Sequence, residues 1–139
     1  MKRILTLFSA LTAVMGLSLN ASSMTTIKLL QTSDIHGNFF PYNFISLARV
    51  YGAVKEARQR YGDNVILLDN GDILQGQPTV YYYNFVDTVT PHVASRMMNF
   101  MRYDAGNVGN HDVETGRKVL ERWSRQCDMP VLGANIIDT

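Results

Sequence analysis

This sequence has little cysteine and little surplus charge. Its 139 residues include one cysteine, Cys127, so an internal disulfide is excluded and stability must come from packing, a metal or a partner. The 13 basic and 12 acidic side chains nearly cancel. No run of basic residues marks a surface for a nucleic-acid polymer or an anionic membrane, so neither is expected as a partner.

Nucleotide-binding glycine motifs and histidines are also scarce. No Gly-x-Gly-x-x-Gly follows any expected strand, which disfavours a Rossmann-like nucleotide binder. The only histidines are His36, His92 and His111. His92 stands beside Pro91 at an expected helix start and is interpreted as an ordinary surface residue. Cys127 has no neighbouring base to generate a thiolate, so a half-buried structural thiol is favoured over a nucleophile.

Residues 1–23 have the pattern of an export signal peptide. Lys2 and Arg3 precede an apolar run over 4–19, and small or polar residues follow at 20–23. The alternative is a membrane anchor, but the run is short for a membrane span and rich in small residues. We expect cleavage after Ala21 or Ser23, no stable membrane anchor afterwards, and a periplasmic or secreted protein.

Apolar runs alternate with amphipathic stretches through the rest of the chain, which predicts an α/β fold with parallel strand pairing. Strands are expected at 25–32, 65–68, 103–108 and 130–137. Helices are expected at 44–61, 81–85, from Thr90-Pro91 onward, and 114–126. The four-residue apolar run at 65–68 suits a strand that is buried on both faces. Thr90 is expected to cap its helix, with Pro91 at the first helical position.

Three polar turns follow the first three strands. They carry Asp34 with His36, then Asp72, then Asn110 with His111 and Asp112, and Asp34, Asp72 and Asn110 are spaced 38 residues apart. The carboxyl ends of parallel strands meet at one edge of a sheet, where functional crevices lie. Each motif alone is an ordinary turn, but together they form a set of oxygen and nitrogen ligands for Mn, Zn, Fe or Mg. One bridging carboxylate can hold two such ions about 3.5–4 Å apart, as in hydrolysis at phosphorus.

In these motifs the chain resembles the calcineurin-like metallophosphoesterases, in particular their exported bacterial branch of 5'-nucleotidases and 2',3'-cyclic-nucleotide phosphodiesterases. The matching segments are Ser33–Gly37, Leu68–Gly76, Met98-Asn99, Tyr103–Ala105, Gly109–Asp112 and Pro130–Asn135. The resemblance implies a metallophosphoesterase-type β-sandwich flanked by helices, of which residues 24–139 would be the N-terminal portion. It also implies metal-dependent hydrolysis of phosphoric esters, most simply nucleotides.

The resemblance also assigns roles to the turn residues. Asp34 and His36 would bind a first divalent metal ion, Asp72 would bridge, and Asn110 would bind a second ion. His111 would act on the phosphate or the leaving group, supported by Asp112, which stands where many nucleotidases have Glu.

One departure from the family pattern leaves an alternative open. Members of the family take further metal ligands from downstream histidines, including a Gly-His-x-His motif, and none occurs here. The second ion would then keep only Asp72 and Asn110. The alternative is therefore a truncated, non-catalytic fragment that binds at most one metal ion, and the isolated chain is expected to be inactive.

Overall fold

The fold is of the α/β class, as predicted. The computed structural model describes residues 24–42, 46–134 and 136. Four parallel strands lie side by side in chain order: β1 (Lys28–Thr32), β2 (Val65–Asp69), β3 (Ala105–Asn107) and β4 (Val131–Leu132). The helical segments between them are α2 (Leu47–Tyr61), α3 (Pro78–Tyr81), the π-helix η1 (Tyr82–Val86), α4 (Val93–Met101), α5 (Asn110–Glu114) and α6 (Arg117–Gln126).

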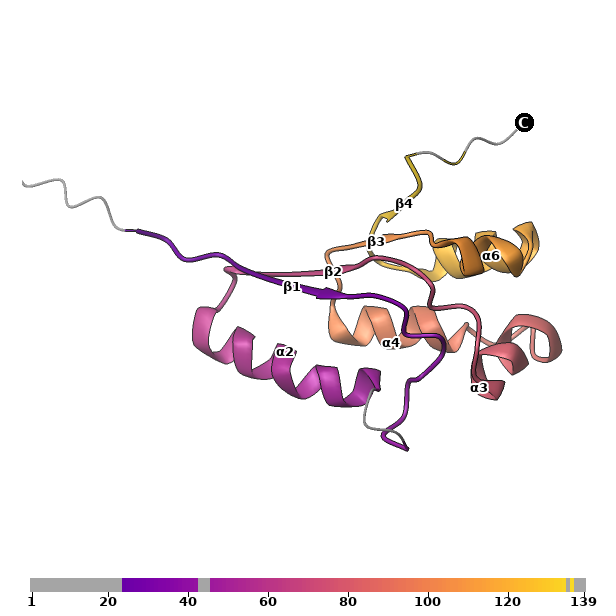
Figure 1. Ribbon diagram of the computed structural model, residues 1–139, viewed down its shortest axis with the longest axis horizontal. Coiled ribbons are helices and arrows are strands. Elements are labelled where there is room, and N and C mark those ends of the chain that lie inside the picture. Colours follow the sequence, from indigo (N-terminus) through magenta and orange to yellow (C-terminus); the bar gives the residue numbers. More distant parts are fainter. Residues whose placement is uncertain (1–23, 43–45, 135, 137–139) are drawn as a thin grey trace, which may run out of the picture.

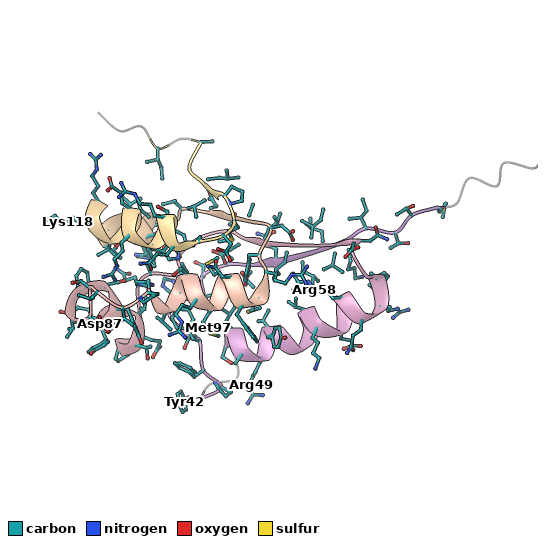
Figure 2. The ribbon with its side chains drawn as sticks, turned by 180° about the vertical axis from the view of Figure 1, so that it is seen from behind. Tyr42, Arg49, Arg58, Asp87, Met97 and Lys118 are labelled. Carbon is teal, nitrogen blue, oxygen red and sulfur yellow. The ribbon has the colours of Figure 1, made fainter. Side chains whose placement is uncertain are left out.

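The helices α2 and α4 cover the same face of the sheet (Figure 1). Parallel strands joined by right-handed crossovers place their helices on one side in this way. The hydrophobic core lies between these layers, and its fully buried members include Leu47, Leu67, Met98, Met101 and Trp123. Arg58 of α2 donates hydrogen bonds to the carbonyl oxygens of Met101 and Arg102, which fastens α2 to the end of α4 (Figure 2).

The opposite face of the sheet is not covered by the described residues. Leu29, Ile66 and Leu132 point to that side and are 60%, 37% and 53% exposed. The expectation that β2 is buried on both faces is therefore wrong for the described part of the chain, because α2 and α4 lie on the other side and Ile66 is exposed. The sandwich architecture implied by the resemblance would place its second layer on this apolar face.

The start of α4 differs from the sequence prediction. The helix begins at Val93, and the capping residue is His92, whose Nδ1 accepts a hydrogen bond from the amide of Ala94. Thr90 does not cap it; its hydroxyl bonds to Asp87 instead. The interpretation of His92 as a surface residue is also wrong, because the side chain is fully buried and its Nε2 lies 2.8 Å from Oδ1 of Asn84 in η1.

Two helices replace the one predicted over 114–126. The chain breaks at Gly116, whose φ of 87° is in the left-handed region that favours glycine, so α5 ends at Glu114 and α6 starts at Arg117. The pair Glu121–Arg125 forms as expected, with 3.4 Å between nitrogen and oxygen. Glu114 does not share a continuous helix with Lys118, and it contacts His111 and Gln75 instead.

Three further expectations concern the segment near Tyr81, the thiol of Cys127 and residues 1–23. The short helix predicted near Tyr81 is present, starting at Pro78 and continuing as η1. Cys127 is partly buried, and burial raises the pKa of its thiol to about 12, as suits a structural role. The predicted signal peptide over 1–23 lies outside the described residues. Within the described ranges, no helix is both long enough and apolar enough to cross a membrane.

His92 should make stability depend on pH. Burial lowers the pKa of its imidazole from the ordinary 6.5 to about 4, so between these values the unfolded chain binds a proton that the folded chain does not. The free energy of unfolding should therefore fall as the pH drops from 6.5 to 4, by up to about 3 kcal/mol from this group alone. We expect His92→Gln, which cannot titrate, to remove this loss in urea denaturation measured across that range.

Comparing the wild type with His92→Gln separates the effect of His92 on stability from that of other titrating groups. Burial raises the pKa of Asp69 to about 6, and a raised carboxyl pKa stabilises the fold as the pH falls, which is the opposite direction. Asp69 is present in both proteins, so its effect cancels in their difference. Parallel pH profiles for wild type and His92→Gln would contradict the assignment.

Candidate active site at the carboxyl end of the sheet

The first two polar turns are joined by backbone hydrogen bonds. The amide of Asp34 donates to the carbonyl of Gly71 at 3.0 Å, and the amide of His36 donates to the carbonyl of Asp72 at 2.9 Å. These bonds continue the parallel pairing of β1 with β2 beyond the strand ends. The register between β1 and β2 therefore also fixes the position of the first turn relative to the second.

The backbones of the second and third turns are in direct contact. A Cβ atom added to Gly71 would lie 2.4 Å from the amide nitrogen of Gly109, and one added to Gly109 would lie 2.2 Å from Oδ1 of Asp72. Only glycine fits at either position. The amide of His111 then donates to the same Oδ1 of Asp72 at 2.8 Å. The three predicted turns therefore meet, as their spacing indicated.

Potential metal ligands gather where the turns meet. His36, Asp72 and His111 each offer a ligand atom, and these atoms lie within 4.8 Å of one another. Asp34 lies at the edge of this group, with its Oδ1 3.9 Å from Nε2 of His36, and Asn110 is exposed at the first residue of α5. Carboxylate oxygens and imidazole nitrogens at this separation suit a hard or borderline divalent cation such as Mn or Zn.

The backbone at these residues is strained. Four residues other than glycine have positive φ in the described part of the chain, and three are Asp34, His36 and Asp72, with φ of 55°, 50° and 61°. Such conformations are unfavourable for residues with a Cβ and persist where the surroundings impose them, often at functional sites. The strain falls on three of the four residues that the sequence marked as metal ligands.

The tautomer of His36 follows from its partner. Its Nδ1 lies 3.2 Å from the carbonyl oxygen of Gln75, which can only accept, so Nδ1 carries the hydrogen. A neutral ring then has its lone pair on Nε2, the nitrogen beside Asp34. A carbonyl that fixes the imidazole in this way is the usual arrangement behind a metal-binding histidine.

His111 has a different partner. Its Nδ1 donates to the Glu114 carboxylate at 2.9 Å, and Glu114 also accepts from Nε2 of Gln75 at 2.9 Å. The hydrogen bond to Glu114 raises the pKa of His111, and the charges of Glu114, Asp72 and Asp112 act in the same direction. His111 therefore retains a proton to higher pH than an ordinary histidine, as suits a proton donor.

The carboxylate that contacts the His111 ring is that of Glu114, not that of Asp112 as the sequence suggested; the charge of Asp112 acts on His111 without a hydrogen bond to the ring. The Asp112 carboxylate is fully buried and accepts hydrogen bonds from the backbone amides of Asp72, Ile73, Leu74 and Gly109. The reason is the helix geometry. Asp112 is the third residue of α5 and folds back over the helix start, whereas the i,i+3 spacing brings Glu114 beside His111. That spacing was the signal for Glu114 that sequence reasoning missed.

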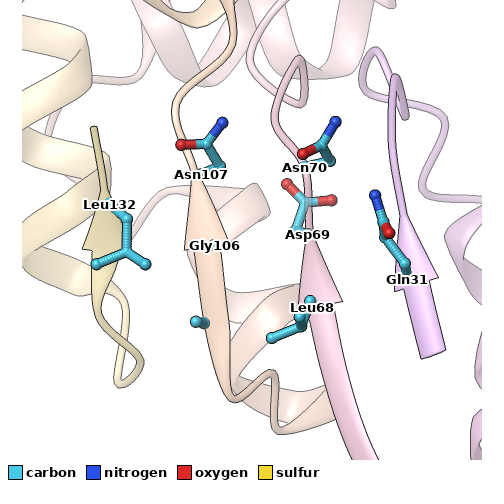
Figure 3. Close-up of a pocket in the computed structure, with 8 residues that line it drawn as sticks. Gln31, Leu68, Asp69, Asn70, Gly106, Asn107 and Leu132 are labelled. Carbon is cyan, nitrogen blue, oxygen red and sulfur yellow. The ribbon is translucent and has the colours of Figure 1, made fainter. Parts of the chain in front are cut away.

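A buried carboxylate lies beneath the turns at the end of β2. Asp69 accepts hydrogen bonds from the hydroxyl of Thr32 at 2.6 Å and from the amide of Gly71 at 3.1 Å. The phenol of Tyr103 lies 2.9 Å from the same Thr32 oxygen. Asp69 also lines a cavity of about 270 Å³ together with Asn70 and Asn107 (Figure 3). Nothing in its sequence position distinguished it from a strand-end turn residue.

Comparison with known proteins agrees with this geometry. The family model of the calcineurin-like phosphoesterases matches residues 27–135, which contain all three turns. The chain belongs to the calcineurin-like phosphoesterase family. Members of this family use divalent metal ions, for which His36, Asp72 and His111 form a possible site.

Curated relatives of this calcineurin-like phosphoesterase chain are named as nucleotide-cleaving enzymes. The trifunctional nucleotide phosphoesterase protein YfkN of Bacillus subtilis is 31% identical over 134 residues, covering 86% of this chain and 9% of that protein. A 2',3'-cyclic-nucleotide 2'-phosphodiesterase/3'-nucleotidase of Yersinia enterocolitica is 31% identical over 149 residues, covering 99% of this chain and 22% of that protein. The chain thus spans about a tenth to a fifth of the length of these relatives.

Solved structures share the fold. A putative 5'-nucleotidase from Staphylococcus aureus superposes with a TM-score of 0.70 at 31% identity, over 78% of this chain and 22% of that one. The calcineurin-like phosphoesterase YfkN from Bacillus subtilis gives a TM-score of 0.68 at 29% identity, over 76% of this chain and 36% of that one.

The contact between His111 and Glu114 leads to a prediction that requires no metal. Glu114→Gln should lower the pKa of His111, because it removes both the carboxylate hydrogen-bond partner and its charge. An NMR titration of the histidine rings measures this shift. Glu121→Gln is the matched control, since Glu121 pairs with Arg117 and Arg125 on α6 and should leave His111 unchanged. An unaltered His111 pKa in Glu114→Gln would refute the pairing.

Proposed function

We propose that this chain carries metal-binding and acid–base residues of a hydrolase that cleaves phosphoric esters of nucleotides. The observation that carries the proposal is the convergence of His36, Asp72 and His111, with ligand atoms within 4.8 Å and with a strained, positive-φ backbone at His36 and Asp72. Membership of the calcineurin-like phosphoesterases supports the reaction class.

Two divalent ions would share the site. Asp34, His36 and Asp72 would hold the first, with Asp72 bridging to a second ion on Asn110. Ions bound there would neutralise the phosphate and lower the pKa of a bound water, and Mn, Zn, Fe and Mg all suit the donors. The support for Asp72 as the bridge is its position, since it lies between the first and third turns and bonds to both.

The chain's own acid–base chemistry would centre on His111. Its Nδ1–H is held by Glu114, so Nε2 is the nitrogen that can pass a proton to the oxygen of the leaving group. The hydrogen bond to Glu114 raises the pKa of His111, so the ring holds that proton to higher pH than an ordinary histidine. Glu114 thereby takes the supporting role that the sequence had given to Asp112.

The substrate class is inferred from the names of relatives. These include the Yersinia enterocolitica cyclic-nucleotide phosphodiesterase/3'-nucleotidase and a human 5'-nucleotidase, which is 31% identical over 144 residues and matched over 23% of its length. We infer a small nucleotide phosphoester, monoester or cyclic diester. The near-neutral charge of the chain disfavours a nucleic-acid polymer. The signal-like residues 1–23 support export to the periplasm or beyond.

A second candidate function rests on the same three residues. His36, Asp72 and His111 could act together as ligands of one ion, with His111 as a ligand and no hydrolysis. Three protein ligands and a water are a common zinc arrangement. This is the metal-binding fragment considered as the alternative from the sequence.

The substitution His111→Ala separates the two candidates. The isolated chain is expected to be inactive, so turnover is measured in a longer protein that joins this segment to the downstream metal ligands of the family. If His111 donates a proton there, turnover of nitrophenyl phosphate or AMP with Mn²⁺ should fall by at least about 100-fold in His111→Ala, while bound Mn²⁺ changes little. Asp72→Ala is the reference, since it should abolish both turnover and metal binding. Parallel loss of turnover and Mn²⁺ in His111→Ala would identify His111 as a ligand. A longer protein that binds one Mn²⁺ and hydrolyses neither substrate would favour the metal-binding alternative.

A further inference from the structure

The buried Asp112 carboxylate joins the second and third turns. Its Oδ1 accepts hydrogen bonds from the amides of Ile73 at 2.9 Å and Leu74 at 2.8 Å. Its Oδ2 accepts from the amides of Asp72 at 2.8 Å and Gly109 at 2.9 Å. All four bonds are to a charged acceptor in a site that water does not reach, the setting in which hydrogen bonds are strong.

The three amides of the second turn converge because of an unusual backbone. Gly71 and Asp72 both have positive φ, 97° and 61°, so the following N–H groups point inward to one spot. Such a concavity of amides binds anions. Here the anion is a side chain of the same protein, contributed by the next turn along the sheet.

The conformation of Asp72 is unfavourable on its own and must be stabilised by its surroundings. A left-handed backbone is unfavourable for a residue with a Cβ, and Asp112 accepts a hydrogen bond from the amide of Asp72 itself. The Asp72 side chain in turn accepts a hydrogen bond from the amide of His111. Asp112 therefore acts on the ligand group through the main chain.

We propose that Asp112 is a positioning residue that holds Asp72 in its left-handed conformation and so aims the Asp72 carboxylate at the metal site. The inference rests on the proposed role of Asp72 as a metal ligand. It assigns to Asp112 no contact with substrate or with His111.

Hydrogen exchange in the metal-free chain tests the hydrogen bonds between Asp112 and the amides of the second turn. Asp112→Asn should speed exchange of the Asp72, Ile73 and Leu74 amides by about tenfold or more, the order expected when bonds to a charged acceptor are lost. The matched control is Asp104→Asn, because Asp104 also accepts a backbone amide, that of Leu67 at 2.7 Å, but at the other end of the strands. Unchanged exchange in the second turn would overturn the proposal.

A double-mutant cycle on Mn²⁺ affinity tests the route through Asp72. In the wild-type background Asp112→Asn should weaken Mn²⁺ binding by roughly 10–100-fold, as loss of a residue that orients a ligand does. In an Asp72→Asn background, which keeps one oxygen donor so that binding stays measurable, the same change should have little further effect. In an Asp34→Ala background, Asp112→Asn should still weaken Mn²⁺ binding by the same factor as in the wild type.

The outcomes separate a positioning role from a general structural one. An Asp112 that merely stabilised the fold would weaken Mn²⁺ binding by the same factor in both backgrounds, which would overturn the proposal. A wild-type chain that binds no Mn²⁺ would instead count against the proposed function. The hydrogen-exchange comparison would still decide whether Asp112 holds the second turn.

Discussion

The left-handed backbone at Asp72 is the constraint on which the site depends. It is bonded from one side by the first turn, whose His36 amide donates to the Asp72 carbonyl, and from the other by Asp112 and the His111 amide. The glycines Gly71 and Gly109 allow the backbones to approach closely enough for these bonds. Parallel pairing of β1, β2 and β3 sets the spacing of the turns, and the amide bonds then fix their conformation.

Two histidines of similar exposure are given different chemistry by what their Nδ1 atoms contact. His36 donates to a neutral carbonyl, that of Gln75, which fixes a tautomer with a lone pair on Nε2. His111 donates to a carboxylate, that of Glu114, which favours the protonated ring. Gln75 connects both arrangements, because its side chain also donates to Glu114. The different partners of the two rings are consistent with the proposed roles, His36 as a metal ligand and His111 as a proton donor, although their ligand atoms lie within 4.8 Å of each other.

Sequence reasoning predicted the parts of this site that depend on strand order. The α/β class and the meeting of the three turns follow from the alternation of strands and helices, since parallel strands bring their carboxyl ends to one edge. The contacts of Asp112 could not be predicted, because they depend on where α5 starts. The contact of Glu114 follows from its i,i+3 spacing to His111, which was missed because Glu114 was assigned to a later helix. His92 was misjudged because its position beside Pro91 at an expected helix start suggested exposure, while its burial comes from packing against η1.

The central claim is that Asp34, His36 and Asp72 hold a metal ion while His111 keeps its proton for chemistry. Anomalous diffraction from crystals of this protein soaked with Mn²⁺ tests it most directly, because it locates the ion without reference to activity. The account predicts an anomalous peak for an ion that is coordinated by oxygens of Asp34 and Asp72 and by Nε2 of His36. Nε2 of His111 should lie outside the coordination sphere. A single peak bonded to His36, Asp72 and His111 would contradict it.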